Sequence, residues 1–263
     1  MTSQPTRRPW TREESILALN LYLTLPFGQM DHRNRQVIDL AAQIGRSANA
    51  VALKLSNFAS LDPDLRSRGI SGMSHRSSAD AAIWEEFAAD REALIYESEQ
   101  FRAARLGQTI EEIAPTADLP PELEGREREA VVRVRVNQQY FRRMILARYD
   151  AHCCITGLAV PQLLTASHIV PWAEAPELRL NPRNGLCLNA LHDRAFDTGL
   201  LTVSDDFKVQ IDSRVQDSDS AAADFLLRFH GSYLKLPDNF EPAVDLLRRH
   251  RERSAMRFPA LAD

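Results

Sequence analysis

The sequence predicts an α+β protein in which a helical N-terminal domain precedes a mixed domain with short strands. Three observations predict this division: helical spacing of apolar residues up to about residue 105, a stretch rich in proline and acidic residues after it, and short β-like runs beside a helical segment beyond residue 150. The expected parts are a helical domain over 1–106, a linker over 107–125 and a second domain over 126–263.

Cap residues signal the first three helices. Thr11 followed by Glu14 has the pattern of a capping box, so a helix is expected to begin near Thr11. A second helix is expected over 34–44 with Gly45 at its end, and a third helix after Ser47. The N-terminal domain is therefore expected to begin with three consecutive helices.

This order of helices is typical of a helix-turn-helix, and equally of any small three-helix bundle. In the first case we expect the N-terminal domain to bind DNA, with Asn49, Lys54 and Asn57 of the third helix in contact with it.

Residues 59–78 carry turn residues and little periodicity, which predicts a long surface loop.

Two segments connect the linker to the rest of the second domain. Residues 130–136 alternate apolar residues with arginine, which predicts a strand. Residues 137–150 predict a helix that has Phe141, Ile145 and Tyr149 on one face.

Length and composition predict a folded protein. The 263 residues are 44% hydrophobic and 26% charged, with a net charge of −4. This charge does not indicate nucleic-acid binding, yet residues 126–148 hold seven arginines against two glutamates. Three cysteines without disulfide or CxxC spacing fit a reducing, cytoplasmic setting. Because no apolar run approaches the ~18 residues of a membrane span, we expect no membrane partner.

The segment over 153–201 combines residue types that hydrolytic chemistry needs. CCITG followed by LLTASHIVPW predicts two strands around a turn, with His168 in the second. Residues 186–197 predict a helix that has Asp193 and Asp197 at positions i and i+4. Two carboxylates on one helix face can bind a single hard cation, and carboxylates favour Mg²⁺ or Mn²⁺.

These residues resemble the HNH nuclease family. Three elements carry the resemblance: His168 in SHIVP, Asn184 in NPRNG, and the helix HDRAFD. Asn184 follows His168 by 16 residues and Asp193 follows Asn184 by 9, which agrees with the family pattern. The resemblance is close over the core 153–211 and implies a ββα-metal fold, which is a β-hairpin and a helix around one divalent metal ion.

The resemblance implies a role for each of these residues. His168 is expected to act as the general base that takes a proton from water. Asp193 and Asp197 are expected to hold the metal ion, and Asn184 to fix the loop that orients His168. His192 is expected at the same site as a metal ligand, as a group that supports a ligand, or as a phosphate contact.

The function that these residues favour is a metal-dependent DNA endonuclease, with bacterial restriction as the setting by analogy with the family. Ser167 departs from the family pattern, because many members carry Asp or His there as a metal ligand. That departure supports one alternative, a DNA-binding regulator with an inactive HNH fold. An RNA-directed nuclease is the other alternative, because metal-assisted hydrolysis does not itself distinguish sugars. Since one site with one metal cuts one strand, a homodimer is expected.

Overall fold

The computed structural model divides the chain into two compact units, Met1–Gln138 and Gln139–Asp263. The residues that it describes are 8–25, 27–63, 65, 77–88, 90–113, 124–216, 220–237 and 241–257. The expected surface loop and linker fall largely on 66–76 and 114–123, which lie outside the described residues. Both therefore stay predictions.

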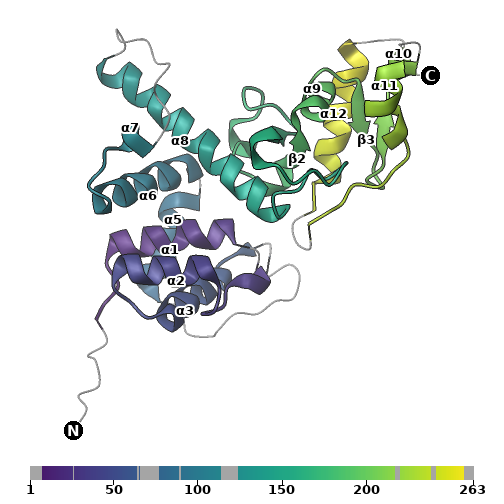
Figure 1. Cartoon of the computed structure of the whole chain (residues 1–263). Helices are drawn as coiled ribbons and strands as arrows, with labels where there is room; N and C mark the ends of the chain where they lie inside the picture. The colour runs from purple at the N-terminus through teal and green to yellow at the C-terminus, as the bar shows by residue number, and fades with distance from the viewer. Residues whose placement is uncertain are drawn as a thin grey trace. The chain divides into compact units, whose positions relative to one another are not determined.

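Helices alone make up the regular structure in the described part of the N-terminal unit (Figure 1). In chain order they are α1 (Arg12–Thr24), the 3-10 turn η1 (Phe27–Gln29), α2 (Arg35–Ile44), α3 (Ala48–Ala59), α5 (Ser78–Ala88), α6 (Arg91–Arg105), α7 (Ile110–Ile113) and the first part of α8 (Gly125–Arg148). Because α8 continues into the C-terminal unit, the boundary between the compact units lies inside a helix. The domain limits expected at the linker stay a prediction. Among the described residues, no helix combines the length and apolar character that a membrane span requires.

The first three helices begin where the local signals place them, and the second also ends there. The Thr11 side chain accepts a hydrogen bond from the Glu14 backbone, and the Glu14 carboxylate accepts one from the Thr11 backbone, so the capping box of α1 is complete. Helix α2 ends at Gly45, whose φ of +64° lies in the left-handed region that glycine adopts without strain. Ser47 caps α3 by accepting a hydrogen bond of 3.2 Å from the Ala50 backbone. These three helix predictions are confirmed.

Two of the three residues expected to contact DNA bind a carboxylate inside the N-terminal unit. Lys54 is 4% exposed and forms an ion pair with Asp80 of α5. Asn57 donates a hydrogen bond of 2.9 Å to the same carboxylate. The prediction is therefore wrong for Lys54, because the spacing that placed it on a helix does not reveal which face packs against α5. For Asn57, which is half-buried, it stays a prediction. A DNA-reading role for this helix stays a prediction that rests on Asn57 and on Asn49, which is exposed.

The segment 130–136, expected to be a strand, lies inside helix α8. Its alternating pattern concealed a helical one, in which every fourth residue is buried: Val132, Val136, Tyr140 and Met144. A stripe at i, i+4 and i+8 is one face of a helix. The strand prediction is wrong, because alternation over seven residues also contains pairs spaced by four.

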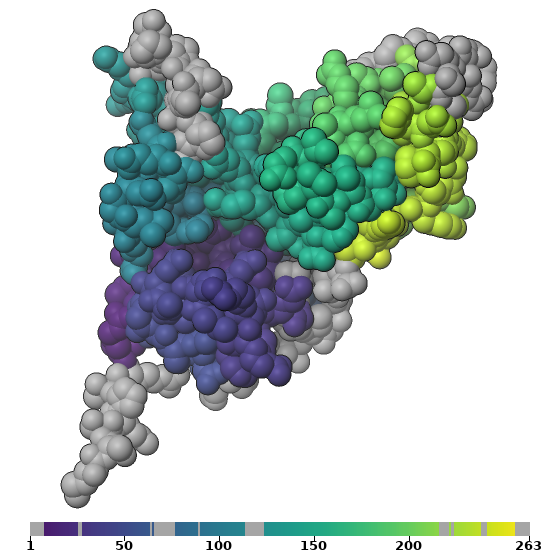
Figure 2. Space-filling view, in the orientation of Figure 1, coloured from purple at the N-terminus to yellow at the C-terminus, as the bar shows by residue number. Residues whose placement is uncertain are grey.

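The C-terminal unit combines two small antiparallel sheets with helices. Strand β1 (Leu164–His168) pairs with β2 (Gly185–Asn189), and β3 (Leu201–Val203) pairs with β4 (Val209–Ile211). Helix α9 (Ala190–Asp197) packs against β1 and β2, and α12 (Val244–Arg257) packs against β3. Helix α12 is the yellow helix of Figure 1, and its residues have the yellow end of the colour bar in Figure 2. The remaining elements are η2 (Pro161–Leu163), η3 (Pro176–Leu178), η4 (Pro182–Asn184), α10 (Ser213–Gln216), α11 (Ser220–Phe225) and η5 (Leu227–Phe229). Together with the helical N-terminal unit, this confirms a mixed fold of helices and small antiparallel sheets.

The second strand of the hairpin lies where the sequence predicts the beginning of a helix. Residues 186–189 belong to β2, and α9 begins at Ala190. Leu186, Cys187 and Leu188 are all fully buried, and a strand covered on both faces lacks the alternation that would reveal it. The hairpin also closes through residues 169–184, not through the CCITG turn. The boundary of the predicted helix and the position of the turn were therefore wrong.

Candidate active site in the C-terminal unit

His168 is the last residue of β1 and lies directly opposite Gly185 of β2. Its Nε2 is 2.9 Å from the backbone oxygen of Arg179, which can only accept a hydrogen bond. Nε2 therefore carries the proton, and in the neutral ring Nδ1 keeps its lone pair. Burial lowers the pKa of His168, and the hydrogen bond to Arg179 opposes this decrease. The ring is thus held as a neutral base with Nδ1 as its proton acceptor.

Two aromatic side chains fix the plane of the His168 ring. Phe141 of α8 stacks on the imidazole, with 3.7 Å between ring centroids and 14° between ring planes. Trp172 meets the imidazole edge-on, at 5.5 Å and 85°. The imidazole therefore lies between a helix that precedes the hairpin and the loop that connects its two strands.

Asn184 holds the loop between β1 and β2. The side chain is fully buried, and its Oδ1 accepts a hydrogen bond of 2.8 Å from the Val170 backbone. Its Nδ2 donates to the backbone oxygens of Val170 at 3.0 Å and of Leu178 at 3.2 Å. Leu178 directly precedes Arg179, whose carbonyl binds His168. The structure thus contains the backbone hydrogen bonds expected of Asn184, whereas its part in catalysis stays a prediction.

Asp193 and Asp197 lie one turn apart on α9. Asp193 is half-buried and Asp197 is exposed. Burial raises the pKa of Asp193, the neighbouring Ser167 hydroxyl lowers it, and the negative charge of Asp197 raises it, with a net increase. The two carboxylates are thus close enough to repel each other, which a shared cation would relieve.

The donor atoms around Asp193 fit a hard divalent cation. Among the described residues, no cluster of three or more His, Cys, Asp or Glu side chains is arranged to hold a metal ion. The candidate donors are instead the two carboxylates and the Ser167 hydroxyl, whose oxygen is buried without a hydrogen-bond partner of good geometry. An unsatisfied buried oxygen beside a carboxylate is suited to a metal ion or to one of its water ligands. Mg²⁺ and Mn²⁺ fit this set, since Mg²⁺ usually keeps several waters.

His192 contacts a different group of residues. Its Nε2 donates to the Phe225 backbone oxygen at 3.0 Å, and its Nδ1 is 2.9 Å from Nδ2 of Asn189. The residue is 1% exposed. With both ring nitrogens bonded to protein atoms, the geometry favours support of neighbouring groups over direct contact with a metal ion or a phosphate. The role of His192 in catalysis stays a prediction.

All three cysteines are buried in the C-terminal unit as free thiols. Burial raises the pKa of Cys154 and of Cys187. For Cys153, burial acts in the same direction, but hydrogen-bonding contacts with His192 and Thr156 outweigh it and lower the pKa of this thiol to about 6.

The contact between Phe141 and His168 was not predicted from the sequence. The predicted helix face of Phe141, Ile145 and Tyr149 is confirmed, and all three side chains are buried. The signal was thus present as an apolar face just before the motif. What the sequence does not contain is the surface against which that face packs.

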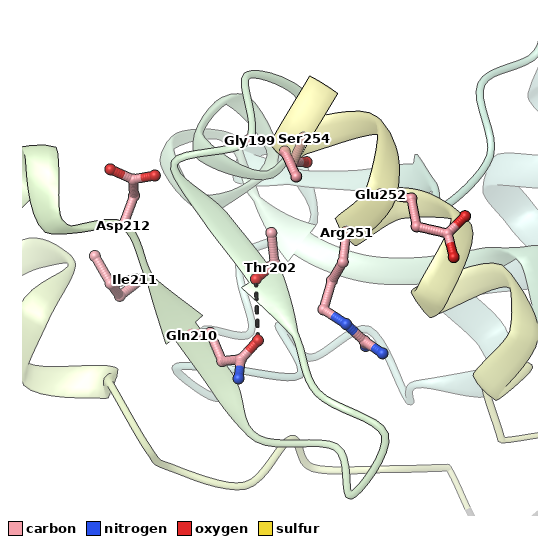
Figure 3. A pocket seen from close by; sticks show the side chains of 9 residues that line it. Gly199, Thr202, Gln210, Ile211, Asp212, Arg251, Glu252 and Ser254 are labelled. Atoms are coloured by element: carbon pink, nitrogen blue, oxygen red, sulfur yellow. Dashed lines mark hydrogen bonds between the residues drawn. The ribbon is translucent and has the colours of Figure 1, made fainter. Parts of the chain in front are cut away.

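A surface cavity in the same unit contains none of the expected site residues (Figure 3). It encloses about 380 Å³ between β3, β4 and α12. Thr202 and Gln210 form a hydrogen bond of 3.3 Å across its wall. Because Arg251, Glu252 and Asp212 line it together, the cavity has no single sign of charge that would favour nucleic acid.

Residues 153–204 match the model of the HNH endonuclease family. His168, Asn184 and all of α9 lie within this match. The match supports the assignment of this part of the chain to the HNH endonuclease family. No curated protein matches the chain. The domain indicates a nuclease-type function with nucleic acid as substrate, and HNH nucleases generally use a divalent metal ion.

Proposed function

We propose that the chain is a metal-dependent endonuclease that hydrolyses DNA phosphodiester bonds, with His168 as the general base. One observation carries this proposal: the bond from Nε2 to the Arg179 carbonyl leaves Nδ1 available to take a proton from water. A neutral base is what hydrolysis near pH 7 requires, because a protonated imidazole cannot accept that proton. The lowered pKa of His168 keeps the ring in this form.

Asp193 and Asp197 would hold the metal ion, with Ser167 or a water beside it. When bound, the ion would supply Lewis-acid stabilisation of the charge that develops on the phosphate and its leaving oxygen. Asn184 keeps the 169–184 loop in place, and through that loop it keeps the Arg179 carbonyl against His168.

The choice of DNA over RNA rests on the resemblance, because arginines such as those of 126–148 can pair with the phosphates of either nucleic acid. Asn49 is the part of the expected DNA-reading set that is still exposed. Bacterial restriction as the biological setting is part of the proposal by analogy with the family. A homodimer is part of it because one site with one metal cuts one strand, so that double-strand cleavage needs two sites.

Ser167 favours a second candidate, a DNA-binding regulator that keeps the fold without cleavage. A neutral hydroxyl is a weaker ligand than a carboxylate or an imidazole. The described residues also contain no cluster of three His, Cys, Asp or Glu side chains for a metal. In this candidate the same surface would bind DNA and leave it intact.

Incubation with supercoiled plasmid distinguishes the two candidates. The purified chain is mixed with plasmids from modifying and non-modifying hosts in the presence of Mg²⁺, Mn²⁺ or EDTA, and His168→Ala serves as the matched control. The endonuclease predicts nicked or linear plasmid with a metal ion and none with EDTA or with the variant. Retarded but uncut plasmid under all conditions would favour the regulator. A parallel single-stranded RNA of equal concentration tests the RNA alternative.

A further inference from the structure

We propose that Phe141 is a positioning residue for His168, which holds the imidazole ring by stacking so that Nδ1 keeps one fixed direction. This inference rests on the proposed function, in which His168 is the general base. Phe141 lies outside the matched family segment, in the second half of helix α8, which precedes that segment.

The stacking geometry is that of a tight and specific contact. The two ring centroids are 3.7 Å apart, the planes are within 14° of parallel, and Phe141 is 1% exposed. A fully buried phenyl ring in this position blocks rotation of the imidazole about χ2, a torsion with a broad and shallow preference of its own. Because rotation of the ring is blocked, the hydrogen bond from Nε2 to the Arg179 carbonyl determines the direction of Nδ1.

Gly185 makes room for this contact from the opposite strand. A Cβ at this position would lie 2.8 Å from Cζ of Phe141 and 2.4 Å from Cδ1 of Ile145. The φ of Gly185 is −137°, which any residue adopts, so space and not backbone conformation calls for glycine here. Because Gly185 pairs directly with His168, the absent side chain lets Phe141 reach the imidazole.

Arg142, the next residue of α8, anchors the other end of the same strand. Its guanidinium donates hydrogen bonds to the backbone oxygens of Leu164, the first residue of β1, and of Pro161. His168 is the last residue of β1. Consecutive residues of one helix therefore fix both ends of the strand that carries the base.

Loss of the phenyl ring is expected to cost rate and not substrate affinity. Phe141 touches the base and is too deeply buried to touch nucleic acid. An error of 1 Å in the position of a reacting group can reduce a rate by about 100-fold. The variant Phe141→Leu, which keeps an apolar side chain without the flat face, is expected to reduce kcat by about tenfold or more and to leave KM for plasmid within about twofold.

The test compares Phe141→Leu with Met144→Ala in the full chain. Met144 is equally buried on the same helix, so its truncation controls for loss of core packing. Plasmid nicking gives kcat and KM. Nitrogen-15 NMR of histidine-labelled protein gives the His168 tautomer, with His168→Ala to assign the signal. We expect one Nε2–H tautomer in the wild type and in Met144→Ala, and an average of two tautomers in Phe141→Leu. Gly185→Ala, which crowds Phe141 without changing either ring, is expected to resemble Phe141→Leu.

Two results would overturn the proposal: an unchanged tautomer in Phe141→Leu, whatever its rate, or a loss of kcat no larger than that of Met144→Ala. If the wild type cleaves nothing with any metal, the proposed function fails, and the NMR comparison still decides whether Phe141 orients His168.

Discussion

Lys54 and Asp80 form an ion pair in the interior of the N-terminal unit, where their side chains are 4% and 2% exposed. The lysine ammonium also lies 4.4 Å from the centre of the Trp10 ring. Asn57 donates a further hydrogen bond to the aspartate. The pair therefore joins α3 to α5. If one partner is removed, the charge of the other stays buried without solvation by water.

Asp80→Ala is expected to destabilise the N-terminal unit by about 3 to 5 kcal/mol, because it leaves the Lys54 ammonium buried without its partner. Urea unfolding measures the change. Asp39→Ala is the matched control, since Asp39 pairs with Arg35 in solvent and exposed pairs contribute at most about 1 kcal/mol. Equal effects of the two substitutions would contradict the importance of the buried pair.

His168→Ala is expected to reduce cleavage by about 10² to 10⁴-fold while DNA binding survives. The imidazole acts on water and contributes little to the attraction of phosphates. Single-turnover cleavage and gel retardation measure the two properties separately. A cleavage rate within threefold of the wild type would remove His168 from the mechanism.

The pH profile of cleavage follows from the lowered pKa of His168. A base whose pKa lies below the ordinary value of about 6.5 stays deprotonated to more acidic pH. We therefore expect kcat/KM to decrease toward acidic pH, as the ring gains a proton, with a midpoint below about 6.5. A midpoint above about 6.5 in the wild type would contradict the lowered pKa of His168, provided that the residual activity of His168→Ala does not show the same midpoint.

Asp193→Ala and Asp197→Ala are each expected to weaken metal binding, and added Mn²⁺ to restore part of the activity of the variant with the smaller loss. Titration calorimetry with Mg²⁺ and Mn²⁺ measures the affinity. Asp206→Ala serves as control, because Asp206 pairs with Lys208 in solvent. Unchanged affinity in both α9 variants would place the cation elsewhere.

Local signals predicted the helical caps, and contacts between distant segments decided the rest. Thr11, Ser47 and Gly45 act on backbone groups within four residues, so their effect is contained in a short stretch of sequence. The strand prediction over 130–136 was wrong because the pattern of apolar residues fits both the two-residue period of a strand and the four-residue spacing of a helix face. Strand β2 was missed because burial of both of its faces removes any period.

The same distinction applies to the candidate site. The residues His168, Asn184, Asp193 and Asp197 were found through their types and spacing. Their partners are the Arg179 carbonyl and the ring of Phe141, and neither contact leaves a trace in the spacing of the motif. For Lys54 the residue type was misleading: its charge suggested DNA binding, but the side chain forms a buried ion pair with Asp80.

The three thiols can report on local unfolding of the C-terminal unit, because all of them lie inside it. The chain has three cysteines, all between residues 153 and 187 and all buried, so a thiol reagent can react only when this unit opens. The rate of labelling under native conditions thus measures local unfolding around the hairpin, with no contribution from the N-terminal unit. Contacts with His192 and Thr156 lower the pKa of Cys153, whereas burial raises the pKa of Cys154 and Cys187, so Cys153 should be modified first where the opening is small.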